Sequence, residues 1–342
     1  MPVLNRLSRR ALYGLAESRR LQALVQGNAV LEDLAYRGAA RYLGGRALEE
    51  ALATLARVHS EGFNTGIDYL GEQRTDPAAV EAATDQYVRL NRQLARLDAS
   101  VNVWVDLTNV GLDISQELCR RQLMRIIDGL PIGSRLQVRA HDSNRIDRIL
   151  ALVTELAAQG APVMPTLQAN LRKAPEYADR LIDAEVPVLL VKGAHLESAE
   201  AAYRWGEETA VAFLRLAHQL RAGEVELTIG THDPVIREAV IAAFPDVAVE
   251  MLLGVRPRDA RDLLHRARSV RLYVPYGGGL APLFPPPARG GTWGVGWPSA
   301  GLEEVRTLLL ARLEVDHETL MKGTGERMDL AACVDAVYDA CS

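Results

Sequence analysis

Lysine is scarce in this chain of 342 residues, since only Lys173, Lys192 and Lys322 stand among its 39 basic residues. Acidic residues number 44, so the net charge is -5 and the chain lacks the basic footprint of nucleic-acid-binding proteins. No apolar run approaches the roughly 18 residues that a membrane span needs. We therefore expect neither a nucleic-acid partner nor a membrane span.

Cysteine is also scarce, and Cys119, Cys333 and Cys341 form no C-x-x-C pair. Their odd number and wide spacing predict reduced structural thiols rather than a disulfide framework or a zinc site. Residues 8–10 read Ser-Arg-Arg, the start of a twin-arginine export signal, but residues 19–20 are arginines and no apolar core intervenes. This pattern predicts an amphipathic N-terminal helix and a cytoplasmic protein.

Residues 1–60 carry apolar side chains at three- and four-residue intervals, which predicts a helical N-terminal segment. Beyond them, within residues 61–342, short apolar runs alternate with longer helical patterns. The runs are 65–71, 101–107, 135–141, 161–168, 186–193, 225–232, 247–254 and 270–277. Eight such units predict an α/β fold, a closed (β/α)8 TIM-like barrel. An open doubly wound sheet is the rival, but no G-x-G-x-x-G follows the first run.

Residues 277–301 are rich in glycine and proline and predict a long loop after the last strand. Helical patterns resume at residues 302–313 and continue to the C-terminus. A loop of this length is either a lid or a static exposed segment, and the pattern fits both.

Polar residues gather where the predicted strands end, which is the mouth of such a barrel. They are Asp68, Glu72, Asp106, Thr108, Asn109, Arg139, His141, Asp142, Gln168, Asn170, Lys192, His195, Thr231, His232, Asp233, Tyr273 and Tyr276. Two chemistries fit this set. One is a metal-dependent hydrolase, with imidazole and carboxylate ligands. Its ligands would be His141, His195 and His232 with Asp142 or Asp233. The other is a site for a phosphate-bearing or aromatic cofactor, with donors from Gln168, Lys192, Thr231 and His232.

Purely structural roles account for part of the set. Asp142, Ser198 and Asp233 would cap the helices that follow them. Asp106 and Arg139 would form an ion pair between neighbouring strands. These roles do not explain why the histidines gather at the same end of the barrel.

Seven segments in order give the chain a resemblance to the proline dehydrogenase family over about residues 60–280. They are DYLGE (68–72), LTNVGLD (107–113), LQANL (167–171), LVKGAHLE (190–197), THD (231–233), EMLLGVR (250–256) and VRLYVPYG (270–277). The resemblance implies a distorted barrel preceded by helices, with FAD across the carboxyl ends of the strands. It also implies oxidation of a secondary amine: hydride passes from the carbon beside nitrogen to flavin N5, and a cyclic imine results. A quinone or another acceptor then reoxidises the flavin; the acceptor and the oligomeric state stay open.

The resemblance assigns roles by position. The residues that match flavin-contacting positions are Gln168, Lys192, Gly193, Thr231 and His232. Lys192 would lie near the isoalloxazine ring or the ribityl-phosphate arm and stabilise negative charge on the reduced flavin. Tyr273 matches a tyrosine that lines the substrate pocket, and Leu252 would form an apolar wall of that pocket.

The chain departs from the family at the charged positions. Asp106 stands where the family usually has a lysine, and Arg139 stands near the position of an aspartate, so the two charges are exchanged. Leu189 replaces an arginine and His195 replaces a tyrosine. The paired arginines that hold the substrate carboxylate in the family are replaced by prolines, Pro286 and Pro287.

These departures remove three cations from one carboxylate site, and each charge-assisted hydrogen bond is worth roughly 1.5–3 kcal/mol. We therefore expect an amine or imino substrate without a free carboxylate rather than free proline. Asp106 would face its cationic group, and His141 or His195 would move protons. The expected catalytic set is Asp106, Arg139, Lys192, His195 and Tyr273, with no metal.

Three alternatives remain at this stage. The chain is a genuine proline dehydrogenase whose carboxylate site is rebuilt from Arg139 and Arg289. Alternatively, it is a relative that binds no flavin and does not catalyse. The third is the metal-dependent hydrolase on a barrel.

Overall fold

A closed barrel of parallel strands forms the centre of the molecule. The computed structural model describes residues 36, 40–70, 74–97, 100–193, 197–203 and 206–277. The strands follow one another round the barrel in chain order, and the eighth pairs with the first. They are β1 (Asn64–Tyr69), β2 (Val101–Val105), β3 (Leu136–Val138), β4 (Val163–Gln168), β5 (Val188–Val191), β6 (Leu227–Gly230), β7 (Ala248–Leu252) and β8 (Val270–Tyr276). The predicted (β/α)8 barrel is confirmed, and each predicted run overlaps one strand.

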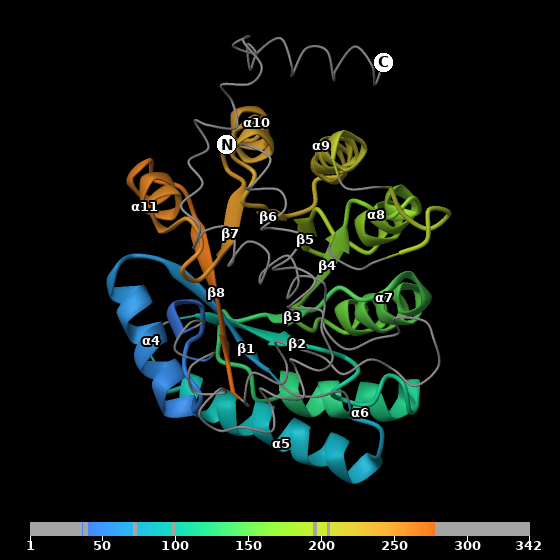
Figure 1. Cartoon of the computed structure of the whole chain (residues 1–342). Helices are drawn as coiled ribbons and strands as arrows, with labels where there is room; N and C mark the ends of the chain where they lie inside the picture. The colour runs from blue at the N-terminus through green and yellow to red at the C-terminus, as the bar shows by residue number, and fades with distance from the viewer. Residues whose placement is uncertain are drawn as a thin grey trace, which may run out of the picture.

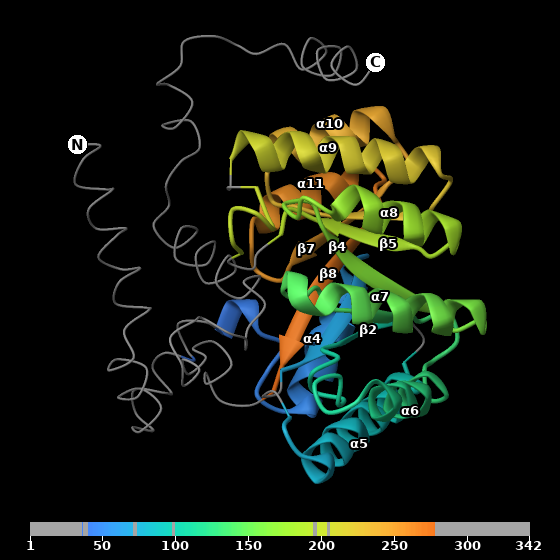
Figure 2. The same ribbon diagram turned by 90° about the vertical axis from the view of Figure 1, so that its right-hand side faces the viewer.

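Helices surround the strands, as Figure 1 shows along one direction and Figure 2 from the side. They are α4 (Leu48–Ser60), α5 (Pro77–Leu94), α6 (Gln116–Ile127), α7 (Ser143–Ala158), α8 (Ala174–Asp183), α9 (Glu207–Ala222), α10 (Pro234–Ala243) and α11 (Pro257–His265), with a short 3-10 turn η1 (Ala40–Tyr42). Helix α4 precedes the barrel and contacts both β8 and β1. It covers the junction of β8 with β1, where the barrel closes. In a regular barrel the helix after the last strand occupies this position.

Polar side chains at the ends of the connecting loops cap the first turns of the helices that follow. The carboxylate of Asp142 accepts a hydrogen bond from the backbone of Asn144, and that of Asp233 accepts from Val235 and Ile236. Both therefore cap the helices that follow them, as predicted.

The prediction for Ser198 was wrong. Helix α9 begins only at Glu207, and the hydroxyl of Ser198 accepts a bond from Ala201 inside a turn. The reason is that the backbone after Ser198 bonds to the β4–α8 connection instead of entering a helix. Arg172 N donates to Ala201 O at 2.9 Å and Tyr203 N donates to Asn170 O at 2.7 Å. A helical periodicity over residues 198–206 is thus overridden by pairing between two loops at the mouth.

Alternation along each strand separates the core from the barrel lining. In β2, Val101, Val103 and Val105 pack outward in the large core shared with the helices, whereas Trp104 lies in a separate cluster with Met164, Leu189 and Tyr273. The strands therefore carry a defined set of side chains towards the carboxyl end of the barrel.

Several predictions fall outside the described residues. They concern the helical pattern of residues 1–35, His195, Arg289, Pro286 and Pro287, the loop over residues 278–301 and the C-terminal helices. Within the described part, no helix is both long and apolar enough to cross a bilayer.

Candidate active site

A buried polar trio joins three strands inside the barrel. Arg139, which follows β3, directs Nη2 to Asp68 Oδ2 of β1 in an ion pair, and the same nitrogen donates to Tyr273 Oη of β8 at 2.7 Å. Tyr273 in turn donates its hydroxyl to Asp68 Oδ2. Asp68 is 1% exposed, Arg139 is 7% exposed and Tyr273 is 6% exposed. The positive charge of Arg139 is thus compensated inside the protein.

An aromatic layer supports this trio. The rings of Trp104 and Tyr273 meet edge to face with centroids 5.1 Å apart. Leu189 and Leu252 pack against the same cluster. Leu189, for which the resemblance predicted the loss of an arginine, is 1% exposed in this apolar layer.

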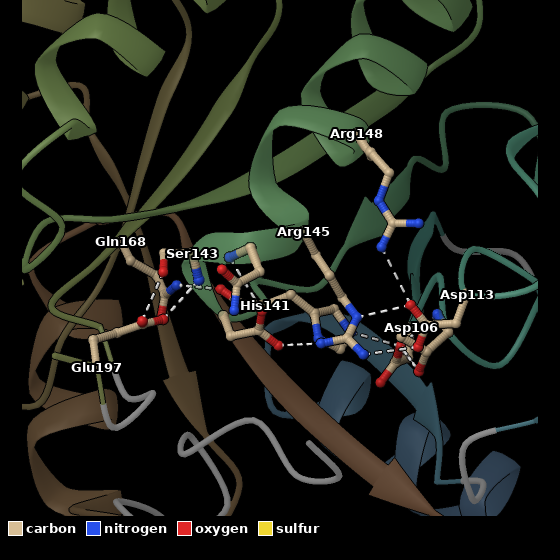
Figure 3. Close-up of polar contacts among 11 residues, drawn as sticks. Asp106, Asp113, His141, Ser143, Arg145, Arg148, Gln168 and Glu197 are labelled. Atoms are coloured by element: carbon tan, nitrogen blue, oxygen red, sulfur yellow. Dashed lines mark hydrogen bonds and ion pairs between the residues drawn. The ribbon is translucent and has the colours of Figure 1, made fainter. Parts of the chain in front are cut away.

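Asp106 and His141 form a second pair at the ends of β2 and β3 (Figure 3). His141 Nε2 lies 2.8 Å from Asp106 Oδ1, and Thr108 donates to the same oxygen from its backbone at 2.8 Å and its hydroxyl at 2.7 Å. Burial alone would raise the pKa of Asp106. The charge and hydrogen bond of His141 together with the bonds from Thr108 outweigh burial and lower that pKa to about 2. Asp106 is therefore a carboxylate throughout the neutral range.

The predicted ion pair between Asp106 and Arg139 is wrong. Arg139 instead reaches across the barrel to Asp68, and Asp106 pairs with His141. The reason is the direction of the side chains. Arg139 points into the barrel, where it meets residues of β1 and β8. Asp106 is instead held in a local turn, because its Oδ1 accepts a hydrogen bond from the backbone of Thr108.

Beside this pair, the start of α7 carries a network of charges, which Figure 3 also shows. Arg145 donates to both oxygens of Asp113, at 2.9 and 2.8 Å, and pairs with Asp142. Arg148 adds a contact of 3.4 Å to Asp113. Each of these arginines therefore has a carboxylate partner.

Two further contacts fix the loop that carries His141. Gln168 Nε2 donates to the carbonyl oxygen of His141 at 2.8 Å. Glu197, from the connection after β5, accepts from the backbone and the hydroxyl of Ser143, both at 2.7 Å. A carboxylate at the first turn of α7 is also favourable towards the helix dipole. Connections from three strands are thus held together at this side of the mouth.

Lys192 follows β5 and pairs with Asp233 at the end of β6, with Nζ 2.8 Å from Oδ2. Both side chains are about one-third exposed. Burial alone would raise the pKa of Asp233, but the hydrogen bond and charge of Lys192 lower it. Gly193 beside it has a φ of +103°, and a Cβ there would meet Asn170 Oδ1 at 1.8 Å. Glycine is therefore required at this position.

His232, next to Asp233, is held as a neutral imidazole. Its Nε2 accepts a hydrogen bond from Leu252 N at 3.1 Å, which leaves the proton on Nδ1. Burial and the nearby charges of Arg256 and Arg237 lower its pKa to about 4. Thr231 accepts from the backbone of Asp233 at 3.2 Å. Gln168, Lys192, Thr231 and His232 thus lie at the consecutive ends of β4, β5 and β6.

Sequence reasoning noted Asp68 at a strand end without giving it a role, and it offered Asp233 only as a helix cap or a metal ligand. It missed Trp104 and Glu197. Alternation along β1 and β2 places Asp68 and Trp104 on the lining side, so that signal was present. Asp233 was read as a cap, yet its second oxygen binds Lys192. Within the described ranges, no group of three or more His, Cys, Asp and Glu side chains is arranged to hold a metal ion.

Comparisons with known proteins agree with this architecture. The sequence model of the family "Proline dehydrogenase" matches residues 51–282. The chain is 27% identical over 250 residues to Proline dehydrogenase 1 of Bacillus subtilis (strain 168), covering 70% of this chain and 82% of that protein. It is 26% identical over 294 residues to Proline dehydrogenase of Deinococcus radiodurans, covering 80% of this chain and 91% of the relative.

A solved structure shows the same fold. Proline utilization A (PutA) from Bdellovibrio bacteriovorus, inactivated by N-propargylglycine, superposes with a TM-score of 0.67 at 16% identity. The match covers 89% of this chain but only 36% of that one, so this chain spans about a third of that protein. With the family match extending over the whole barrel, the chain belongs to the proline dehydrogenase family, whose members are oxidoreductases that act on CH–NH groups.

Proposed function

We propose that this chain is an FAD-dependent dehydrogenase that oxidises the CH–NH group of a small amine to an imine, and that its substrate lacks a free carboxylate. The observation that carries the second part is the compensation of Arg139 by Asp68 and Tyr273. Each of the other cations placed at the mouth above also has a carboxylate partner. The described mouth therefore offers no uncompensated arginine or lysine to a substrate carboxylate.

The donor set fits FAD. Lys192 is paired with Asp233, but both side chains are about one-third exposed, so an anionic group of the cofactor can share its ammonium as it cannot share the buried guanidinium of Arg139. Gln168, Thr231 and His232 supply an amide, a hydroxyl and an imidazole at neighbouring strand ends. Asn170 Oδ1 is buried without a hydrogen-bond partner among the described residues, beside the Gly193 backbone. When bound, FAD supplies the hydride acceptor of the reaction. The protein contributes the groups that hold the cofactor and the surface that receives the amine.

Releasing Arg139 for a carboxylate would be costly. A buried charge that loses its partner destabilises a protein by roughly 3–5 kcal/mol. A substrate carboxylate would have to displace Asp68 or share the guanidinium with it, and the two carboxylates would repel one another. An amide, an ester or a simple cyclic amine avoids this cost.

A genuine L-proline dehydrogenase is the second candidate. The named relatives are proline dehydrogenases, and Arg139 Nε is a buried donor without an acceptor among the described residues. A carboxylate that reached this nitrogen would gain a charge-assisted hydrogen bond without breaking the pair with Asp68. The relative rates of flavin reduction by L-prolinamide and L-proline decide between the two candidates.

Titration of the full-length protein with FAD tests the cofactor assignment, followed by the visible absorption spectrum. We expect saturable flavin binding that Lys192→Ala weakens about tenfold or more, because a charge-assisted bond is lost. Lys173→Ala is the matched control, since Lys173 is an exposed lysine at the start of α8, and it should bind FAD like the wild type. No flavin uptake, or equal affinity of Lys192→Ala and wild type, would contradict the assignment.

A further inference from the structure

The carboxylate of Asp106 differs from the other aspartates described at the mouth in its partners. Asp68 pairs with Arg139, Asp113 and Asp142 pair with Arg145, and Asp233 pairs with Lys192. Among the residues that the structure describes, Asp106 has no arginine or lysine within ion-pair distance, and its charged-group partner is the imidazole of His141. Asp106 therefore lacks the arginine or lysine partner that each of these other aspartates has.

The two oxygens of Asp106 are used unequally. All three hydrogen bonds, from His141 and from the backbone and hydroxyl of Thr108, end on Oδ1. Oδ2 accepts none from the described residues, and the side chain keeps 13% of its surface exposed. If Asp106 only stabilised the local turn, the two hydrogen bonds from Thr108 would be sufficient. The added bond from His141 on the same oxygen instead orients the carboxylate and leaves one oxygen available.

Apart from His141, the titratable groups whose pKa the charge of Asp106 shifts carry no positive charge. Tyr87 of α5 and Cys119 of α6 face it, and burial followed by the charge of Asp106 raises the pKa of each. Both therefore stay neutral over the ordinary range. The charge of Arg148 lowers the pKa of Cys119 and that of Asp113 raises it. His141 is thus the titratable group that directly touches the carboxylate.

We propose that Asp106 Oδ2 binds the ammonium group of the substrate and that His141 is a positioning residue, which holds the carboxylate through Oδ1. This inference deepens the proposed function, because it names the charge that the substrate must carry. The substrate class is a small cyclic or secondary amine that binds in its ammonium form and releases one N–H proton to solvent before hydride leaves the neighbouring carbon. Such a cation would compensate the charge that no lysine or arginine of the described chain compensates.

Binding of two small isosteres, measured anaerobically on the protein loaded with reduced FAD, tests this inference without turnover, because reduced FAD accepts no hydride. Pyrrolidinium carries the charge and tetrahydrofuran does not, while the ring size is the same. We expect wild type to bind pyrrolidinium about ten- to a hundredfold more tightly than tetrahydrofuran, as a charge-assisted bond to a carboxylate implies. Equal affinity for the two rings, or binding of neither, would overturn the proposal even if no variant were made.

Variants test whether the preference for pyrrolidinium comes from the charge of Asp106. Asp106→Asn keeps an oxygen for Thr108 and His141 and removes the charge, so it should lose most of the preference for pyrrolidinium and bind tetrahydrofuran as before. Asp147→Asn, the same change in an exposed pair with Arg180 on the outer surface, should keep the preference. His141→Gln can still donate to Asp106 and should stay within about threefold of wild type, whereas His141→Leu should lose about tenfold.

The failure of this inference is distinct from failure of the proposed function. If Asp106→Asn retains FAD and its thermal stability but keeps the full preference for pyrrolidinium, the role of Asp106 is wrong while amine oxidation stands. Equal behaviour of His141→Gln and His141→Leu would overturn the positioning role of His141. Failure to bind FAD in any form would instead contradict the proposed function.

Discussion

The two polar sites inside the barrel mouth contain similar groups and differ in how their charges are compensated. The trio of Asp68, Arg139 and Tyr273 joins β1, β3 and β8 and satisfies its charges internally. The pair of Asp106 and His141 lies at the ends of β2 and β3, includes no arginine or lysine, and leaves Oδ2 of a partly exposed carboxylate without a partner in the described chain. Asp68 Oδ1 also has no partner among the described residues, but Asp68 is buried beside Arg139. The comparison teaches that the presence of a charge at a strand end does not make it available to a ligand. Whether a ligand can use such a charge depends on the partners that the charge already has inside the protein.

Removal of a partner from the closed trio should give the largest effect. Asp68→Ala leaves the guanidinium of Arg139 buried and uncompensated, so we expect the free energy of unfolding to fall by about 3–5 kcal/mol. Urea unfolding followed by circular dichroism measures the change. A loss below about 1 kcal/mol would mean that Arg139 finds another partner and that the trio is not closed.

His232 should give the next largest effect, and it depends on pH. Its folded pKa of about 4 lies below the ordinary value of 6.5, so the unfolded chain binds the extra proton first as the pH falls. The neutral imidazole therefore contributes fully above about pH 6.5, and about 3 kcal/mol is lost as the pH falls towards 4. His232→Gln can accept the bond from Leu252 and should lose stability less steeply in that window. Parallel curves for the two proteins in urea unfolding at a series of pH values would contradict this account.

Opening the trio should change substrate choice. Asp68→Asn keeps the shape of the side chain and removes its negative charge, so Arg139 becomes available to a carboxylate. We expect the efficiency with L-proline relative to L-prolinamide to rise about tenfold, the value of one charge-assisted bond. Anaerobic flavin reduction by each compound measures the ratio. An unchanged or lower ratio in a stable Asp68→Asn protein would show that Arg139 does not control recognition of carboxylates.

An exposed ion pair should give the smallest effect and calibrate the others. Asp147 and Arg180 lie 2.7 Å apart on α7 and α8, with side chains 66% and 40% exposed. Because water screens such pairs, Asp147→Ala should change the free energy of unfolding by less than about 1 kcal/mol. A change as large as that of Asp68→Ala would remove the contrast between buried and exposed pairs.

The sequence predicted the barrel well because its signals are local. Alternation and length identified each strand, and the capping residues Asp142 and Asp233 indicated where α7 and α10 begin. The ion pair of Arg139 could not be predicted in this way, because its partner is far away in the sequence. Arg139 and Asp68 are 71 positions apart and lie on strands that are not neighbours, so adjacency on β2 and β3 wrongly suggested Asp106 as the partner.

The start of α9 was mispredicted for the same kind of reason. The residues after Ser198 have helical periodicity, but bonds to the β4–α8 connection hold them in a turn. The strand-end positions of Gln168, Lys192, Thr231 and His232 followed from the strand count, whereas the contact of Lys192 with Asp233 needed the structure. Sequence pattern thus predicts which residues reach the mouth, and three-dimensional contacts decide which of them are already occupied.

The rate of anaerobic flavin reduction by L-prolinamide and by L-proline tests the central claim most directly. Both compounds carry the same secondary ammonium group, and only one carries a free carboxylate. With Arg139 compensated and Asp106 available, L-prolinamide should reduce the FAD-loaded wild type about tenfold more efficiently than L-proline. Equal or faster reduction by L-proline would contradict the account, because Arg139 would then accept a carboxylate despite its bond to Asp68.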